Sequence, residues 1–267
     1  MSAVDDLFAR LKAEGQKALM PFVTAGDPDV NFTASLIESL ASRGCHICEV
    51  GIPYSDPIAD GPVIQASYTR ALDKHITLSA ILEMLGKTAP QVSMPLVTMV
   101  SYAIVYRHGL QEYVRDAKAA GVAGLIVPDL PVEESDKLSG VCAAADLSLI
   151  QLVTPTTSPE RTKRIVETST GFLYYVSVVG ITGERTTLPD ELVDNVGRLR
   201  EQTDLPICIG FGISRPEHVR MLAPVADGLI VGSAIVRQMA ECEEKSADAV
   251  RGQIETYVGE LLAALND

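Results

Sequence analysis

The sequence lacks several features that would direct it to nucleic acid or a membrane. The chain has a net charge of −13 and contains no block of Lys or Arg. This composition argues against nucleic acid or an anionic membrane as the main partner. No apolar run approaches the length of a membrane span. The amphipathic, acid-containing N-terminus has no apolar core segment, so we expect neither a signal nor a transit peptide. We therefore predict a cytoplasmic protein.

A disulfide framework is also missing. The five cysteines are an odd number, and four of them lie in apolar or helical stretches. Cys45 and Cys48 have the C-x-x-C spacing of a redox motif or half a zinc site. They fall within a predicted strand, where residues three apart point to opposite faces and cannot share a ligand. We predict that they are buried structural thiols.

What the sequence does contain is a regular alternation of short apolar runs and amphipathic segments. The eight runs are residues 18–26, 45–52, 94–102, 123–130, 147–155, 172–180, 205–212 and 227–234. Such runs are typical of a parallel sheet covered by helices. A repeat of about 33 residues per strand–helix unit predicts an α/β fold, a (β/α)8 TIM barrel that forms a single domain over residues 1–267. An open doubly wound sheet is the alternative.

Local signals predict where three of the helices begin. Asp27-Pro28 supplies a cap and a first-turn proline before an apolar helix face, and Ser158-Pro159 does the same for the fifth helix. Ser214 and Glu217 have the spacing of a capping box for the seventh. In a barrel of this kind, catalytic groups belong at the carboxyl ends of the strands and in the loops that follow them.

Further absences narrow the chemistry. No G-x-G-x-x-G follows the first strand and no G-x-S-x-G occurs anywhere. None of the eight lysines falls on a predicted strand, so a Schiff-base aldolase has no candidate amine. The four histidines are scattered without metal-ligand spacing. What remains is acid–base chemistry by carboxylates without a metal.

Two carboxylates stand out near the second predicted strand. Glu49 lies inside it, where a charged group is costly unless it is paired or used. Burial there favours the protonated form and raises the pKa toward the operating pH, as general acid–base catalysis requires; an ion-paired structural Glu is the alternative. The following loop, 53–62, has three prolines and carries Asp60. Asp56, in the same loop, is equally compatible with an ordinary turn.

Glycines end the last two predicted strands, in segments 210–214 and 232–234. In this fold the loops after those strands, with a short helix, often bind phosphate through backbone N–H groups, although tight turns use the same residues. The only basic residue in these loops is Arg215, so a phosphate would be held mainly by the backbone. The polar, glycine-flanked loop 180–187 suits a mobile lid; a plain surface loop is the alternative.

Residues 49–62, EVGIPYSDPIADGP, closely resemble the signature of the tryptophan synthase alpha chain family. Other segments agree with that family in the same order: 21–28, 128–131, 180–183, 210–214 and 232–234. The resemblance covers nearly the whole chain. It implies a carbon–carbon lyase of tryptophan biosynthesis, which cleaves indole-3-glycerol phosphate by a retro-aldol reaction to indole and D-glyceraldehyde 3-phosphate.

The resemblance also implies roles for individual residues. Glu49 would protonate indole C3 and remove the glycerol hydroxyl proton, and Asp60 would accept the indole N–H. The positions that match the walls of the indole pocket are Phe22, Ile64, Tyr174 and Phe211. Those that match the phosphate site are Gly183, Gly212, Gly232 and Ser233, and Thr182 matches the lid residue that meets the loop aspartate on closure. We expect no metal and no cofactor on this chain.

The family works in an α2β2 hetero-oligomer with the tryptophan synthase beta chain, which carries pyridoxal phosphate and receives indole through a tunnel. Loop 53–62 and the segment after the third strand would face that partner. Residues 101–104, SYAI, depart from the Tyr, Asn and Pro of many relatives, so we assign Tyr102 no substrate role; Val178 replaces an Arg of some members. Two alternatives stay open: a free-standing indole-producing lyase, and a catalytically weak subunit that allosterically activates its partner.

Overall fold

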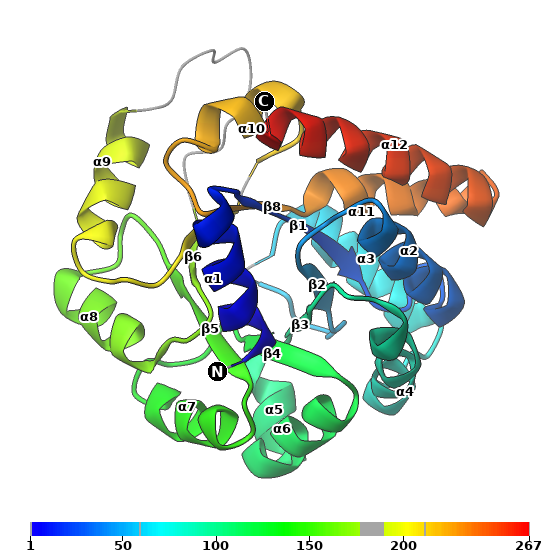
Figure 1. The fold of residues 1–267 in the computed structure, drawn as a ribbon. Coiled ribbons are helices and arrows are strands. Elements are labelled where there is room, and N and C mark those ends of the chain that lie inside the picture. The colour runs from blue at the N-terminus through cyan, green and yellow to red at the C-terminus, as the bar shows by residue number, and fades with distance from the viewer. Residues whose placement is uncertain (1, 59, 177–189, 211, 267) are drawn as a thin grey trace.

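Eight parallel strands close into a barrel in the computed structural model, which describes residues 2–58, 60–176, 190–210 and 212–266. The strands follow one another around the barrel in sequence order, and β1 closes it by pairing with β8 (Figure 1). The strands are β1 Ala18–Thr24, β2 Cys48–Gly51, β3 Leu96–Met99, β4 Val122–Ile126, β5 Ser148–Val153, β6 Leu173–Val176, β7 Ile207–Gly210 and β8 Gly228–Val231. The predicted (β/α)8 barrel is confirmed, and the open sheet is wrong because β1 and β8 are hydrogen-bonded to each other.

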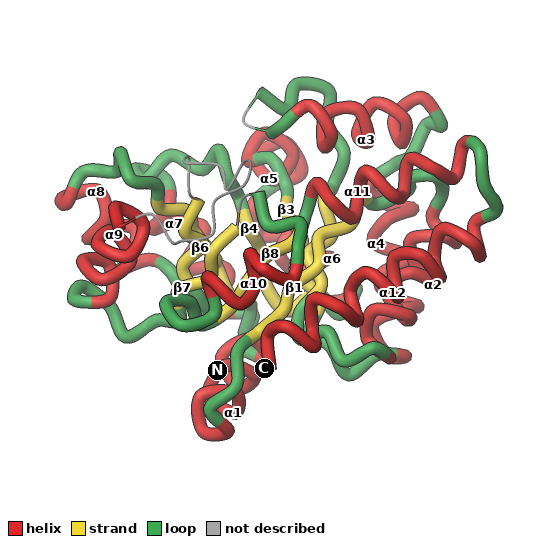
Figure 2. The backbone as a smooth tube through the Cα atoms, turned by 90° about the horizontal axis from the view of Figure 1, so that it is seen from above, coloured by secondary structure: helices red, strands yellow, loops and turns green. Residues whose placement is uncertain are grey.

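Helices surround the barrel (Figures 1 and 2). Single helices follow four of the strands: α2 Val30–Ser42, α7 Ser135–Ala144, α8 Pro159–Thr168 and α10 Pro216–Leu222. Pairs follow three: α3 Pro62–Asp73 with α4 Leu78–Thr88, α5 Tyr102–His108 with α6 Leu110–Ala119, and α11 Ser233–Met239 with α12 Ala247–Asn266. Helix α9 is Asp190–Arg200, and 3-10 turns lie at Ala89–Gln91 and Ala240–Glu243. The chain thus carries more helices than the one per strand that the alternation predicted.

The additional helix α1, Ala3–Glu14, closes one end of the barrel. In Figure 1 it lies across the barrel axis, and Figure 2 shows it beyond the ends of the strands. Its buried side chains Val4, Leu7 and Phe8 join the cluster that fills the barrel interior, and the rings of Phe8 and Phe172 are 5.6 Å apart. Ser2 contacts Ser148 at the start of β5. Since α1 blocks the amino ends of the strands, only the carboxyl ends remain for a substrate.

Of the three predicted helix starts, one is confirmed and two are wrong. Ser158 caps α8 as predicted, because its side chain accepts a hydrogen bond from the backbone N–H of Arg161. The cap of α2 is Asp29 rather than Asp27. The capping box at Ser214 is wrong: α10 begins at Pro216, so Arg215 occupies the cap position and makes no side-chain cap hydrogen bond. Proline, whose fixed φ suits the first helical position, sets this start one residue later than the box requires.

Cys45 and Cys48 agree with the prediction of buried structural thiols. All five thiols are free, and Cys45 and Cys48 are buried. Burial raises the pKa of Cys45 to about 12, so this thiol stays protonated at neutral pH and is a structural group. In the part of the chain that the structure describes, no helix combines the length and the apolar character needed to span a bilayer.

Asp27, which was predicted to cap α2, instead forms a buried ion pair that joins the β1–α2 loop to α3. Asp27 is 1% exposed, and the Arg70 guanidinium donates to both of its carboxylate oxygens, from Nε at 3.0 Å and from Nη2 at 2.6 Å. Nearby, the hydroxyls of Thr24 and Ser67 are hydrogen-bonded at 2.7 Å. These two links, which we call the α3 clasp, hold α3 against the end of β1. The loop that carries Asp60 leads directly into α3, so the clasp also anchors that loop.

We predict that Arg70→Ala lowers the free energy of unfolding by about 3 kcal/mol, because it leaves the buried Asp27 carboxylate without its partner. The matched control is Arg43→Ala, which removes an exposed pair with Glu255 and is expected to cost less than about 1 kcal/mol. Urea denaturation followed by circular dichroism measures both. Equal losses in the two variants would contradict the importance of the α3 clasp.

Candidate active site

Glu49 lies on the inner face of the barrel. Its β2 position pairs with Phe22 of β1 and Val97 of β3, and Ile47, two residues earlier, belongs to the interior cluster. Because side chains alternate along a strand, Glu49 points the same way as Ile47. The side chain is fully buried, and neither carboxyl oxygen has a hydrogen-bond partner among the described residues. No described Lys, Arg or His forms an ion pair with it, so the structure does not support the ion-paired alternative.

The environment of Glu49 decides its protonation. Burial raises its pKa well above the ordinary value for a glutamate, because the charged form loses its hydration and gains no counter-charge. Its buried site therefore favours the protonated form of the carboxyl group. A protonated carboxyl in an apolar site is a proton donor whose conjugate base is strongly basic, as an acid–base catalyst needs.

Asp60 lies at the same end of the barrel, in the loop between β2 and α3. Its side chain is half-buried, and the Tyr54 hydroxyl donates to its Oδ2 at 3.3 Å. The side-chain amide of Gln65 donates to the backbone carbonyl oxygens of Asp60 at 2.8 Å and Pro57 at 3.1 Å. The pKa of Asp60 is raised above its ordinary value, mainly by burial and also by the charge of Asp129, and the hydrogen bond from Tyr54 offsets part of this rise.

Two tyrosines show that the structure brings Glu49 and Asp60 into one region. Burial raises the pKa of Tyr68, on α3, and of Tyr174, on β6, and the proximity of both carboxyl groups adds to this effect. Tyr68 is fully buried and its ring lies 5.6 Å from that of Tyr54. Sequence analysis missed Tyr54 and Tyr68; the signal for Tyr68 was its position four residues after Ile64, on the same face of α3.

The predicted pocket walls that the structure describes lie around this region. Phe22 is buried next to Glu49 on the neighbouring strand, and Ile64 is buried on the first turn of α3. A side chain at Gly51 would overlap the Phe22 ring and lie 2.8 Å from the Tyr68 hydroxyl oxygen. The missing side chain therefore leaves room for both rings above Glu49. Tyr174, on β6, is half-buried and packs against the interior cluster.

The two glycine turns predicted to bind phosphate lie side by side, because β7 and β8 are neighbours. Gly212 has a φ of +73°, which other residues adopt only with strain. Gly232 precedes α11, and its carbonyl oxygen accepts from the N–H groups of Ile235 and Val236. Ser233, the first residue of α11, is exposed, as is Arg215. Both turns follow the carboxyl ends of their strands, where Gly212 is exposed and Gly232 is half-buried.

The predicted lid, loop 180–187 with Thr182 and Gly183, lies outside the described residues. The same holds for Val178 and Phe211. For the metal-free prediction, the described part of the chain holds no group of three or more His, Cys, Asp or Glu side chains arranged for a metal ion.

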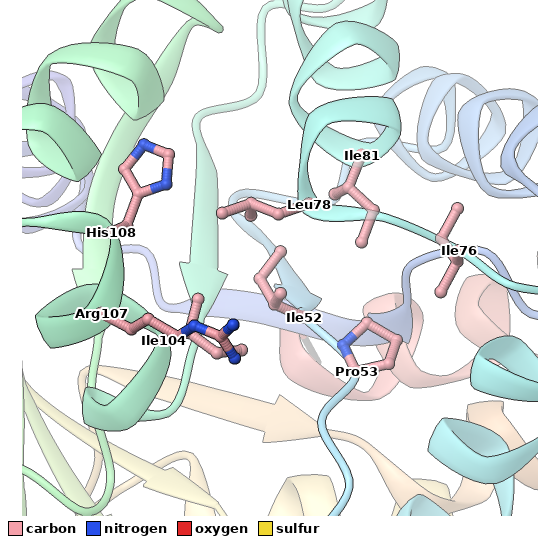
Figure 3. A pocket seen from close by; sticks show the side chains of 8 residues that line it. All are labelled: Ile52, Pro53, Ile76, Leu78, Ile81, Ile104, Arg107 and His108. Atoms are coloured by element: carbon pink, nitrogen blue, oxygen red, sulfur yellow. The ribbon is translucent and has the colours of Figure 1, made fainter.

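A pocket of about 360 Å³, which we call the α4–α5 pocket, lies outside the barrel between α4 and α5. Figure 3 shows apolar side chains from the end of β2 and from both helices converging on it, with Arg107 reaching in from α5. Its lining contains neither Glu49 nor Asp60. This pocket is therefore separate from the region of the two carboxyl groups.

Comparison with known proteins agrees with this geometry. The model of the tryptophan synthase alpha chain family matches residues 8–266. The tryptophan synthase alpha chain of Rhodopirellula baltica is 56% identical over 263 residues, 97% of this chain and 95% of that one. That of Arabidopsis thaliana is 43% identical over 98% of this chain and 95% of that one.

Solved structures show the same likeness. The tryptophan synthase subunit alpha of Legionella pneumophila superposes with a TM-score of 0.89 at 34% identity, covering 100% of this chain and 99% of that one. A chain from the tryptophan synthase a2b2 complex of Pyrococcus furiosus gives a TM-score of 0.86 at 35% identity, covering 93% of this chain and 99% of that one. The chain therefore belongs to the tryptophan synthase alpha chain family, the lyases that cleave indole-3-glycerol phosphate.

Proposed function

We propose that this chain cleaves indole-3-glycerol phosphate to indole and D-glyceraldehyde 3-phosphate with Glu49 as the acid–base catalyst. The observation that carries the proposal is the fully buried Glu49 carboxyl, which has no ion-pair or hydrogen-bond partner among the described residues. Such a group is expensive to keep in a barrel interior unless it is used. Family membership supplies the substrate.

The chemistry follows from the protonation state of Glu49. The protonated carboxyl gives its proton to indole C3, which makes the ring an electron acceptor with positive charge at nitrogen. The resulting Glu49 carboxylate removes the proton from the glycerol hydroxyl next to the bond to be broken. The carbon–carbon bond then breaks, its electron pair returns to the ring, and the hydroxyl carbon becomes an aldehyde. Glu49 ends protonated, so the catalyst is regenerated.

Asp60 is assigned to the positive charge that develops on the indole nitrogen. As a carboxylate it accepts the indole N–H and stabilises that charge in a site with little water. The indole ring would lie among Phe22, Ile64, Tyr174 and Phe211. Burial favours the protonated form of Glu49, and the hydrogen bond from Tyr54 favours the ionised form of Asp60. This difference lets Glu49 act as the acid and Asp60 as the anion.

We predict that Glu49→Gln lowers kcat for indole release at least about 100-fold, because the amide neither donates nor accepts the transferred proton. Asp60→Asn should lower kcat/KM about 100-fold by removing the negative charge. The control is Glu83→Gln, which changes an exposed carboxylate paired with Lys87 on α4 and should leave the rate unchanged. Full activity in either of the first two variants would refute the assignment.

For the phosphate of the substrate, we propose binding by backbone N–H groups at Gly183, Gly212, Gly232 and Ser233, with Thr182 in a lid that closes over the site. The adjacent turns after β7 and β8 and the positive φ of Gly212 support this arrangement. The dipole of a helix start adds a partial positive charge. Arg215, exposed at the cap of α10, contributes little in this proposal.

Substrate affinity tests the phosphate proposal. In the inactive Glu49→Gln background, Gly212→Val should raise the substrate Kd about tenfold or more, since it strains the backbone that presents the N–H groups. Arg215→Ala should raise it about threefold or less, as expected for an exposed charge. Isothermal titration calorimetry measures both. A larger effect of Arg215→Ala would contradict binding by the backbone.

For the product, we propose transfer of indole to a tryptophan synthase beta chain in a cytoplasmic α2β2 complex, with pyridoxal phosphate on the partner and no cofactor on this chain. Two large apolar side chains support a docking surface: Ile58, 91% exposed in the β2–α3 loop, and Tyr106, 69% exposed on α5. These are the two segments expected to face the partner, and the α4–α5 pocket borders α5 (Figure 3). We infer that the two segments form the docking surface.

Titration with a beta chain from a close relative tests this partner. We expect indole release to accelerate on addition of the beta chain. Ile58→Asp should raise the half-saturating concentration of the beta chain about tenfold or more. Val193→Asp, on α9, alters another exposed apolar residue and serves as the control. An unchanged turnover would instead support a free-standing lyase. Substrate binding without cleavage, with or without the beta chain, would support a catalytically weak activating subunit.

A further inference from the structure

The geometry points to Tyr54 as a positioning residue for Asp60, and we propose that its hydroxyl keeps the Asp60 carboxyl ionised and oriented toward the substrate. The inference rests on the role proposed above for Asp60. It adds a residue that sequence analysis left without a function, and it assigns Tyr54 no contact with the reacting atoms.

The contact between Tyr54 and Asp60 is held from both sides. The Tyr54 hydroxyl lies 3.3 Å from Asp60 Oδ2, and its ring packs against the ring of Tyr68 at 5.6 Å and 53°. Tyr68 is fully buried on α3, the helix that the α3 clasp fixes to β1. On the other side, Gln65 holds the backbone of Asp60. The donor and the acceptor are therefore both anchored on α3, and their relative position is defined.

No cation balances the charge of Asp60 within the described residues. The groups that shift its pKa are Tyr54 from its own loop and Asp129 from the loop after β4. Tyr68 from α3 and Tyr174 from β6 also face it, because the charge of Asp60 raises their pKa values. Asp129 is itself fixed, because its carboxylate accepts from the Ser101 hydroxyl and from the Tyr102 backbone N–H, both at 2.7 Å. Among these neighbours, the Tyr54 hydroxyl supplies the hydrogen bond that stabilises the ionised form.

Tyr54 is suited to be a permanent donor. Burial and the neighbouring carboxylates raise its pKa above the ordinary value for tyrosine, so the hydroxyl keeps its proton throughout the range in which the enzyme would work. For Asp60, burial and Asp129 raise the pKa, and the hydrogen bond from Tyr54 opposes them. Removing the hydroxyl therefore leaves both opposing effects in place and moves the pKa of Asp60 further upward.

The sign of the pH effect follows. Asp60 must be ionised to act, so kcat/KM falls as the pH drops through the pKa of Asp60 in the free enzyme. Tyr54→Phe raises that pKa, so the acid limb should move to higher pH, by about one unit for the loss of a hydrogen bond to a charged group. Asp129→Asn removes a negative neighbour while keeping an acceptor for Ser101 and Tyr102. It should move the limb in the opposite direction.

The experiment compares kcat/KM for indole release by the full chain, wild type against Tyr54→Phe, from about pH 5 to pH 9. The substrate phosphate titrates in the same range but identically for both enzymes, so the difference between their limbs isolates Asp60. Above the limb, Tyr54→Phe should lose no more than about threefold, because Phe keeps the ring that packs on Tyr68. The control is Tyr257→Phe, whose hydroxyl on α12 is buried without a hydrogen-bond partner among the described residues; its limb should match that of the wild type.

The outcomes separate the two proposals. A limb that stays at the wild-type pH in Tyr54→Phe, with or without a uniform loss of rate at all pH values, overturns the role of Tyr54. Failure of the wild-type chain to release indole, or full activity of Asp60→Asn, overturns the proposed function instead. An unchanged thermal unfolding midpoint in Tyr54→Phe confirms that the comparison is between equally folded proteins.

Discussion

The site depends on one uncompensated carboxyl group in the interior of a barrel. Glu49 has no counter-charge among the described residues, and burial favours its protonated form. This condition requires that water and cations stay away from β2. Helix α1 meets it at the amino ends of the strands, where its apolar face completes the interior cluster. Only the carboxyl ends are then open, so a substrate and the proposed proton donor meet at one end of the barrel.

The second carboxyl group has the opposite surroundings although it lies nearby. Asp60 is half-buried and hydrogen-bonded, in a loop stiffened by prolines and anchored through Gln65 to α3. The α3 clasp fixes that helix to β1 through the buried pair of Asp27 and Arg70. A difference in environment between two like groups gives them different protonation states at one pH. The proposed mechanism needs this difference, with Glu49 as the acid and Asp60 as the anion.

The acidity of the chain limits how it can hold an anionic substrate. With a net charge of −13, the protein offers a phosphate little long-range attraction. The turns after β7 and β8 suggest a local solution, in which backbone N–H groups and the start of α11 provide partial positive charge at short range. Such recognition depends on backbone conformation, as at Gly212, and less on an exposed side chain such as that of Arg215.

The sequence by itself determined the strands, the barrel and the places of Glu49 and Asp60, because apolar runs, their spacing and the loop motif are local patterns along the chain. Helix starts depend partly on contacts outside the local pattern. Ser158 caps α8 as predicted. Ser214 is not a cap, because Pro216 begins α10, and Asp27 is bound by the distant Arg70. Only the tertiary structure decided that α1 closes the barrel, that Glu49 has no partner among the described residues, and that Tyr54 and Tyr68 stand beside Asp60. These features depend on contacts between residues that are far apart in the sequence. A local pattern along the chain does not reveal such contacts, because they form only when the barrel closes.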